Sequence, residues 1–96
     1  MEFEWDDNKS EQIFCTRGFD FGFAAQAFLD SRAIHRPDTR SNYGEERFRL
    51  YGHAAGRLLV VVYTKREARF RIITAWKANE REIQDHAGWQ LAEGNI

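Results

Sequence analysis

Arginine residues alternate with apolar residues in two segments of this sequence. Residues 47–50 read Arg-Phe-Arg-Leu and residues 69–72 read Arg-Phe-Arg-Ile. Successive side chains of a β-strand point to opposite faces, so each segment is predicted to place its arginines on one face of a sheet. A guanidinium group keeps its proton at neutral pH and binds phosphate oxygens through two N–H groups at once. These segments therefore favour a phosphate-binding surface formed by Arg47, Arg49, Arg69 and Arg71.

Two further residues could exchange protons close to such a surface. Glu82 and His86 are four residues apart, which puts both on one face of a helix. RNA can be cleaved without a metal ion when a base removes the proton of the 2′-hydroxyl, an acid protonates the leaving 5′-oxygen, and positive charge stabilises the phosphate. Arg49, Arg71 and Lys77 could supply that charge, and the need for a 2′-hydroxyl would spare DNA. The simpler interpretation is that Glu82 and His86 form a solvated helix pair.

The sequence favours neither a metal site nor a bound cofactor. The histidines His35, His53 and His86 are far apart in sequence, and Cys15 has no second thiol to pair with. The glycines bracket turns and form no GxGxxG or GxxxxGK[ST] loop that could hold a phosphate. We therefore expect a protein that needs no metal and no cofactor.

Charge is distributed unevenly along the chain. The formal net charge is −1, but residues 31–77 carry eleven Lys and Arg against four Asp and Glu, whereas the segments before and after are acidic. The basic segment could form a positive surface that accepts phosphates. For any single arginine, the simpler interpretation is a solvated strand residue paired with Glu45, Glu46 or Glu67.

Length and composition predict a single domain over residues 1–96, in which residues 87–96 are a tail that frays or docks. The single cysteine offers no disulfide framework, which is typical of a cytoplasmic protein. No apolar run approaches the roughly 20 residues of a membrane span. Residues 1–5 are acidic and aromatic and do not resemble a signal sequence. We expect a cytoplasmic protein with no membrane partner.

Residues 56–77 are predicted to organise the fold as a β-hairpin. Residues 58–62 form an unbroken apolar run, which is typical of a strand covered on both faces. Residues 69–75 alternate as a half-exposed strand does. The hairpin would therefore present the arginines of its second arm from a rigid sheet.

Capping signals predict two helices before this hairpin. Residues 6–8 offer N-cap oxygens for the first helix, and Asn8 with Glu11 fits a capping box. Gly18 is expected to stop this helix, and Asp20 is expected to cap the second.

The remaining elements are shorter strands and one more helix. A helix over residues 77–86 is expected to begin after the N-cap Asn79 and to end at Gly88. Alternating side chains predict further strands over residues 1–5 and 45–52, and a short strand is also expected over residues 32–36.

Together these elements predict an α+β fold. The two N-terminal helices must cover one face of the sheet, because no other element can bury its apolar side chains. We expect an antiparallel sheet of about four strands and a C-terminal helix that brings Glu82 and His86 towards the other face. That face would carry Arg49 and Arg71.

Five segments taken together resemble a known family. They are FEWDDNK, RGFDFGFAAQAF, YGEERFRLYG, GRLLVVVYT and RFRIITAWKANERE, and they extend over about the first 86 residues. In these segments the chain resembles the BrnT toxins of bacterial type II toxin–antitoxin systems. The resemblance implies a RelE-like fold, a ribonuclease that arrests translation, and inhibition by a BrnA-type antitoxin. It also implies a heterotetramer that contacts DNA only through the antitoxin.

The resemblance implies roles for single residues as well. Functional positions of the family fall on Lys9, Arg71, Lys77 and Glu82. The family usually has Arg, His, Asn and Tyr where this chain has Trp76, Arg17, Ile13 and His86, respectively. His86 could still transfer protons near neutral pH, and Trp76 could stack on a base.

Two functions fit these observations. The first is an RNA endonuclease toxin with Arg71, Lys77, Glu82 and His86 as catalytic residues. Its RNA contacts would come from Lys9, Arg47, Arg49, Arg69 and Trp76. The second is a non-catalytic or attenuated relative that binds an antitoxin or nucleic acid, as the loss of a basic residue at Trp76 suggests. The simplest interpretation is an α+β domain whose arginines are only solvated.

Overall fold

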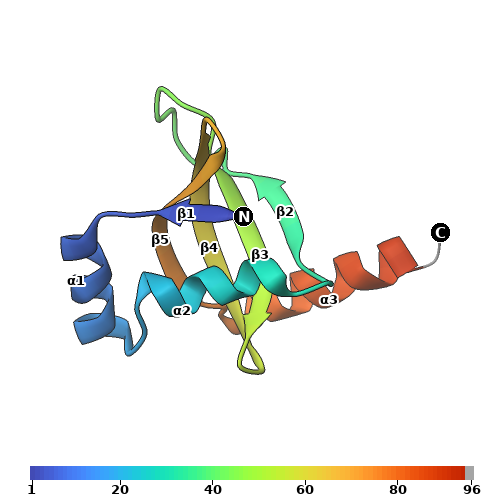
Figure 1. Cartoon of the computed structure of the whole chain (residues 1–96). Helices are drawn as coiled ribbons and strands as arrows, with labels where there is room; N and C mark the ends of the chain where they lie inside the picture. Colours follow the sequence, from blue (N-terminus) through green and yellow to red (C-terminus); the bar gives the residue numbers. More distant parts are fainter. Residues whose placement is uncertain (95–96) are drawn as a thin grey trace.

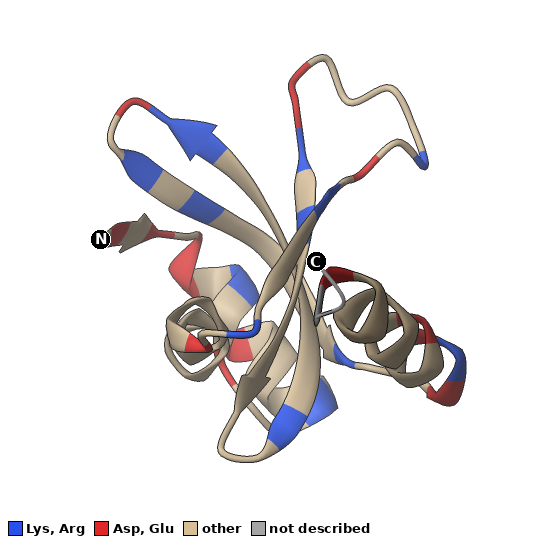
Figure 2. Cartoon of the chain, turned by 90° about the vertical axis from the view of Figure 1, so that its right-hand side faces the viewer, with Lys and Arg blue, Asp and Glu red and all other residues tan. Residues whose placement is uncertain are grey.

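A computed structural model describes residues 1–94 as a five-stranded sheet with helices (Figure 1). The strands are β1 (Glu2–Glu4), β2 (Ile34–Pro37), β3 (Phe48–Ala54), β4 (Arg57–Arg66) and β5 (Arg69–Lys77). The helices are α1 (Asp7–Arg17), α2 (Phe21–Ala25), the 3₁₀ helix η1 (Gln26–Leu29) and α3 (Glu80–Gly94). Figure 2 shows α1 and α2 on one side of the sheet and α3 on the other. The predicted α+β class is confirmed.

The sheet is mixed, with the strand order β1-β5-β4-β3-β2. β1 runs parallel to β5 at one edge, and the other neighbouring strands are antiparallel. The predicted N-terminal edge strand is present, but the sheet has five strands where about four antiparallel strands were expected. Whether β1 pairs in parallel with β5 depends on the path of the chain between the two strands. The alternation of side chains within a strand carries no information about that path.

Two tight turns join the three central strands. Ala55 and Gly56 connect β3 to β4 with φ angles of 50° and 78°, the left-handed values that a two-residue type I′ turn requires. Glu67, with φ 56°, lies in the turn between β4 and β5. Residues 58–64 of β4 are all buried. The predicted hairpin with a buried first arm is confirmed.

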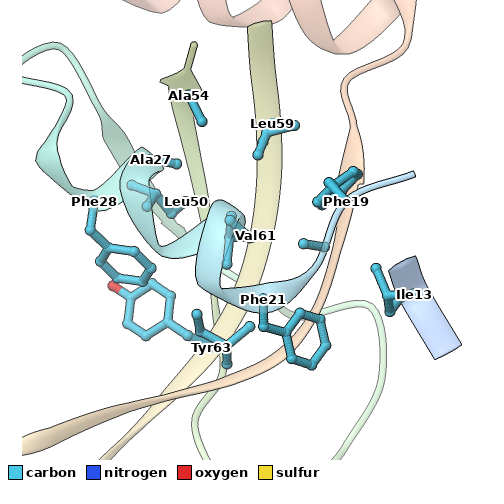
Figure 3. Packing of buried hydrophobic residues seen from close by; sticks show 13 residues of the cluster. Ile13, Phe19, Phe21, Ala27, Phe28, Leu50, Ala54, Leu59, Val61 and Tyr63 are labelled. Carbon is cyan, nitrogen blue, oxygen red and sulfur yellow. The ribbon is translucent and has the colours of Figure 1, made fainter. Parts of the chain in front are cut away.

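α1, α2 and η1 cover one face of the sheet, as predicted, and enclose the main core (Figure 3). Gly52 allows η1 to approach β3 closely, because a Cβ atom at this position would lie 2.5 Å from the carbonyl oxygen of Ala27. Large side chains fill the space around this contact, including Phe21, Phe28, Leu50, Leu59, Val61 and Tyr63.

Side chains at the helix ends explain where α1 and α2 begin and end. Among the three predicted N-cap candidates, Asp6 caps α1 by accepting hydrogen bonds from the backbone N–H groups of the first turn. Asn8 therefore lies inside the helix, and the predicted capping box with Glu11 is wrong. Gly18 ends α1 in the left-handed conformation, and Asp20 caps α2, both as predicted.

α3 begins with a reciprocal capping box. The Glu82 N–H donates to Asn79 Oδ1 over 2.8 Å, and the Asn79 N–H donates to Glu82 Oε1 over 2.9 Å. The prediction that Gly88 ends this helix is wrong, because Trp89 packs edge-on against Tyr51 at 4.9 Å between ring centroids and the helix continues to residue 94. Most of the predicted tail is thus helical, and residues 95 and 96 lie outside the described part of the chain.

Candidate functional site

The face of the sheet towards α3 carries both apolar residues and arginines. Tyr51, Leu58 and Val60 form a small buried cluster that packs against Trp76 and Trp89. One step further along β2 and β3, the next residues on the same face are arginines, Arg36 opposite Arg49. The apolar patch therefore borders directly on a basic one.

Five residues in this region form what we call the arginine–tryptophan cluster: Arg36, Arg40, Arg49, Trp76 and Trp89. The guanidinium carbon of Arg36 lies 4.2 Å from the Trp89 ring centroid, and that of Arg40 lies 5.3 Å from the Trp76 ring centroid. The Arg49 guanidinium carbon lies 5.7 Å from the ring centroid of Tyr51. Cation–π contacts of this kind orient a guanidinium without neutralising its charge.

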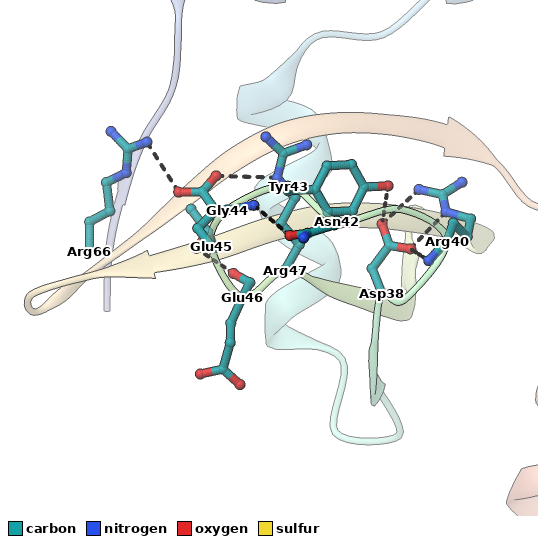
Figure 4. A network of polar contacts seen from close by, with 10 residues as sticks. Asp38, Arg40, Asn42, Tyr43, Gly44, Glu45, Glu46, Arg47 and Arg66 are labelled. Carbon is teal, nitrogen blue, oxygen red and sulfur yellow. Dashed lines mark hydrogen bonds and ion pairs between the residues drawn. The ribbon is translucent and has the colours of Figure 1, made fainter.

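Asp38 is a buried carboxylate beside the cluster (Figure 4). Arg40 binds both of its oxygens, with Nε 2.7 Å from Oδ1 and Nη2 2.8 Å from Oδ2. The hydrogen bonds from Arg40 lower the pKa of Asp38, and the charge of Arg49 adds to this effect while burial opposes it. Asp38 is therefore ionised at neutral pH and balances the charge of Arg40.

Arg47, predicted to bind RNA, belongs to a separate network in the loop before β3. Its Nε lies 3.2 Å from Glu45 Oε2, and its guanidinium carbon lies 4.1 Å from the ring centroid of Tyr43. The second oxygen of Glu45 lies 3.5 Å from Arg66 Nη2 (Figure 4). Glu45 thus bridges Arg47 and Arg66, as the simpler interpretation of these arginines expects.

Arg69 and Arg71 are paired with acidic residues of β1. The parallel register puts Glu2 beside Arg69 and Glu4 beside Arg71. The two ion pairs measure 3.2 Å from Arg69 Nε to Glu2 Oε2 and 2.7 Å from Arg71 Nη1 to Glu4 Oε2. A phosphate would have to displace Glu4 before it could bind Arg71 in the same way.

Glu82 lies against the arginine–tryptophan cluster from the first turn of α3. Both of its carboxylate oxygens are 3.2 Å from Nε1 of Trp76, which donates to them. Burial raises the pKa of the neighbouring Tyr51, with the charge of Arg49 opposing this shift and that of Glu82 adding to it. Arg49 lies over Tyr51, Tyr51 shares the small cluster with Trp76, and Trp76 donates to Glu82, so the structure brings Arg49, Trp76 and Glu82 of the predicted site onto one surface.

His86 is buried, with only 7% of its surface exposed. Its ring centroid lies 5.7 Å from that of His53, whose Nδ1 lies 3.0 Å from Asp30 Oδ2. The side-chain nitrogen of Gln90 is 3.2 Å from His86 Nε2. Burial lowers the pKa of His86, so the ring is neutral at pH 7. This position suits a residue that docks α3 onto the end of the sheet.

Comparison with known protein families gives a match over most of the chain. Residues 5–82 match the family described as "Ribonuclease toxin, BrnT, of type II toxin-antitoxin system". The chain belongs to the BrnT family. Among curated proteins, the comparison finds no match. Family membership confirms the resemblance seen in the sequence, and it implies a ribonuclease toxin whose partner is an antitoxin.

Two basic residues predicted for the BrnT site lie elsewhere. Lys77 follows Trp76 in β5 and so points to the opposite face, where it lines a hollow with Phe19 and Phe23. Lys9 lies on α1, across the sheet from α3 (Figure 2), and partial burial lowers its pKa. Their roles remain predictions that these positions do not favour.

Four residues that shape this BrnT surface were missed in the sequence: Arg36, Asp38, Arg40 and Trp89. Alternation in the predicted strand over residues 32–36 was a signal that could have identified Arg36. Asp38 and Arg40 gave no such signal, because they look like ordinary polar loop residues. Trp89 follows a glycine that was expected to end the helix, and it also lies outside the family match.

Two features are absent from the described part of this BrnT chain. No group of three or more His, Cys, Asp or Glu side chains within residues 1–94 is arranged to hold a metal ion. In the same range, no helix combines the length and apolar character required to cross a bilayer.

Proposed function

We propose that this chain is an endoribonuclease that cleaves RNA without a metal ion and thereby arrests translation in the cytoplasm. The reactive surface is the α3-facing side of the sheet. The observation that carries the proposal is the position of Arg49, Trp76 and Glu82 around one small cluster on this surface, in a chain that matches a ribonuclease toxin family.

Glu82 is the base of the proposed reaction. Its carboxylate takes the proton of a 2′-hydroxyl, the 2′-oxygen attacks the adjacent phosphorus, and the bond from phosphorus to the 5′-oxygen breaks. The leaving oxygen takes a proton from water, so the products are a 2′,3′-cyclic phosphate and a 5′-hydroxyl end. Glu82 is favoured over His86 because its oxygens lie on the cluster, whereas the ring of His86 is buried.

Arginines stabilise the negative charge that builds up on the phosphate during this reaction. Arg49 is one candidate, because its guanidinium lies over Tyr51, whose pKa the charge of Glu82 also affects. Arg71 contributes after a phosphate has displaced Glu4. A guanidinium suits this role because it cannot lose its proton and it binds two phosphate oxygens at once.

The variant Glu82→Gln tests the base directly. Glutamine can still accept the hydrogen bond of the capping box, so α3 should keep its N-terminal turn. Loss of a general base is expected to slow cleavage by about 10²- to 10⁴-fold. Cleavage of a labelled single-stranded RNA is measured with and without EDTA, and mass spectrometry identifies the cyclic phosphate. Arg81→Gln on the same helix is the control.

Full cleavage by Glu82→Gln, or loss of cleavage in EDTA, would contradict the mechanism. In cells, expression of the chain alone is expected to stop growth, and Arg71→Ala is expected to relieve the arrest. Harmless expression of the wild-type chain, together with no cleavage in vitro, would refute the ribonuclease proposal for this protein.

The antitoxin partner is proposed to be of the BrnA type and to form a heterotetramer, with DNA bound only by the antitoxin. Support comes from the family, whose members belong to type II toxin–antitoxin systems. Co-expression with the neighbouring antitoxin gene should restore growth, and light scattering should give the mass of two copies of each chain. A complex with one copy of each would contradict this stoichiometry.

A weakened nuclease is the alternative, because Trp76 stands where the family usually has arginine. The indole N–H occupies both oxygens of Glu82 and would compete with a 2′-hydroxyl for the base. Arg40, however, lies above the indole and brings a guanidinium to this position, although Asp38 binds it through both oxygens. The alternative is supported if the wild-type chain does not cleave RNA and the Trp76→Arg variant does. It loses its basis if the wild-type chain cleaves RNA and the substitution leaves the cleavage rate unchanged.

A further inference from the structure

Arg36 and Arg49 are direct partners in the pairing of β2 with β3. Directly opposite residues of antiparallel strands have Cβ atoms about 4.5–5.5 Å apart, and like charges at such positions destabilise the sheet. Neither arginine forms an ion pair with a carboxylate within residues 1–94. Two positive charges are therefore held side by side without an anion from the described chain.

The same two arginines carry buried donors without a hydrogen-bond partner among residues 1–94. The Nε atoms of Arg36 and Arg49 are both inaccessible to solvent, and neither has a hydrogen-bond partner in the part of the chain that is described. Buried donors in native proteins are nearly always paired, since an unpaired one lowers stability. Arg36 and Arg49 are only partly buried as whole residues, so an anion with several acceptor oxygens could bind their accessible parts and relieve the repulsion, while the Nε atoms themselves stay closed to it.

The acidic residues near this pair are already engaged. Asp38 is held through both oxygens by Arg40. Glu82 accepts from Trp76 and from the backbone of Asn79. Asp85, the other carboxylate whose charge reaches Tyr51, lies 3.4 Å from Arg81 Nε. These carboxylates are therefore not free to pair with Arg36 and Arg49, and an anionic ligand could supply the missing negative charge.

Aromatic rings around the pair indicate the kind of ligand. Arg36 lies over Trp89, and Arg49 lies over Tyr51. Trp76 and Trp89 keep part of their surface exposed, whereas Tyr51 is buried. Exposed aromatic surface beside arginines is the means by which proteins stack unpaired bases and hold the backbone between them. We infer that Arg36 and Arg49 bind a phosphodiester of single-stranded RNA next to the one that is cleaved. This inference rests on the proposed ribonuclease function and adds a subsite to it.

Trp89 is the positioning residue of this subsite. It comes from the part of α3 beyond residue 82, where the family match ends. One side of the indole packs against Tyr51, and the Arg36 guanidinium lies 4.2 Å from the ring centroid. The extension of α3 past Gly88 thus holds Arg36 in place opposite Arg49.

Binding is tested with a probe that cannot be cleaved. The probe is a fluorescein-labelled single strand of about eight 2′-O-methyl nucleotides, a length within the range of small single-strand sites. Fluorescence anisotropy is recorded at several salt concentrations for the wild type, Arg36→Gln, Arg49→Gln and Trp89→Ala. Arg57→Gln is the matched control, because Arg57 is an exposed arginine of the same sheet beside the β3–β4 turn.

Arg36→Gln and Arg49→Gln are each expected to bind the probe roughly tenfold more weakly than the wild type. In each, the negative slope of log K against log salt should become less steep by about 0.7 to 1. Trp89→Ala should weaken binding with little change in this slope. Because the repulsion is removed, neither glutamine variant should unfold at a lower temperature than the wild type. A duplex of the same sequence should bind more weakly than the single strand.

The inference is overturned if Arg36→Gln and Arg49→Gln bind the probe as tightly as the control Arg57→Gln does. It is also overturned if both glutamine variants unfold at a lower temperature than the wild type, or if the duplex binds as tightly as the single strand. Unchanged RNA binding with weaker binding of the antitoxin would also overturn it and assign the pair to the protein interface. Because the probe cannot react, failure of the ribonuclease proposal is seen separately: the wild type would bind the probe through these arginines but leave ordinary RNA intact.

Discussion

The two faces of the sheet are formed by alternate residues of the same strands, yet they are closed in different ways. Against α1, α2 and η1, side chains such as Phe21 and Leu50 have no exposed surface. Towards α3, the apolar patch around Val60 ends at Arg36 and Arg49, whose Nε atoms lack partners within residues 1–94. The helix-covered face buries apolar side chains and so stabilises the fold, whereas the α3-facing side retains charges that are unpaired in the described chain and that a ligand could bind.

This difference indicates that stability and activity can be changed separately. Substitutions on the helix-covered face should act on the free energy of unfolding, and cleavage should change only through the folded fraction. Substitutions on the α3-facing side should alter cleavage or RNA binding by more than their effect on stability explains.

Phe21→Ala should have the largest effect on stability. Phe21 has 0% exposed surface and packs against the ring of Trp5 at 6.4 Å, so its removal should cost about 3–5 kcal/mol. Urea unfolding measures this loss, and Phe14→Ala is the control because Phe14 is 57% exposed. Similar losses in both variants would mean that the helix-covered face is not the main core.

Gly52→Ala tests the close approach of η1 to β3. The added Cβ would lie 2.5 Å from the carbonyl oxygen of Ala27, so the backbone must move at a cost of about 1–3 kcal/mol. Gly88→Ala is the opposite control, since nothing lies within 4 Å of its Cβ position and alanine favours a helix by about 0.8–1 kcal/mol. Thermal unfolding should move in opposite directions for the two variants.

Asn79→Ala should separate the two faces most clearly. Loss of an N-cap costs about 1 kcal/mol, and Glu82 also loses the residue that orients it. Cleavage should therefore fall further than the fraction of folded protein. Asp6→Ala removes the cap of α1 on the other side, and its cleavage rate should stay at the wild-type value once folding is accounted for. Equal losses of cleavage in both variants would contradict the separation.

The smallest predicted effect is a pH dependence of stability. Burial lowers the pKa of His86 and of His35 below the unfolded value of about 6.5. Below that pH the unfolded chain binds more protons, so stability is full above pH 7 and falls as the pH drops from 7 to 5. His86→Asn should make this slope shallower in urea titrations, whereas Lys77→Gln should leave it unchanged. A slope as steep in His86→Asn as in the wild type would show that His86 does not dock α3 in its neutral form.

The parts of the fold that depend on local chemistry could be predicted from the sequence. Gly18, Asp20 and Asn79 mark helix ends through their own backbone preferences and hydrogen bonds, and the arms of the β4–β5 hairpin follow from apolar periodicity. Such signals need only a few neighbouring residues. These local signals were sufficient to predict the α+β class and the face of the sheet that the N-terminal helices cover.

The site could be predicted only in part, because it depends on pairings between distant residues. Arg49 and Glu82 were identified from their types, but the opposition of Arg36 and Arg49 is set by the register of β2 on β3. The pairing of Arg71 with Glu4 likewise depends on β1 joining the far edge of the sheet. The helix continues past Gly88 because Trp89 packs against Tyr51, and a contact between residues so far apart in sequence leaves no local pattern.

The parallel contact between β1 and β5 also sets an order of events during synthesis. Glu2, Phe3 and Glu4 leave the ribosome before their partners Arg69, Phe70 and Arg71, which follow 67 residues later. Until the hairpin of β4 and β5 has emerged, the N-terminal segment has no strand to join, and contacts of such long range form slowly. The nascent chain therefore stays incomplete at this edge until β5 has been translated, and the ion pairs of Glu2 and Glu4 can form only then.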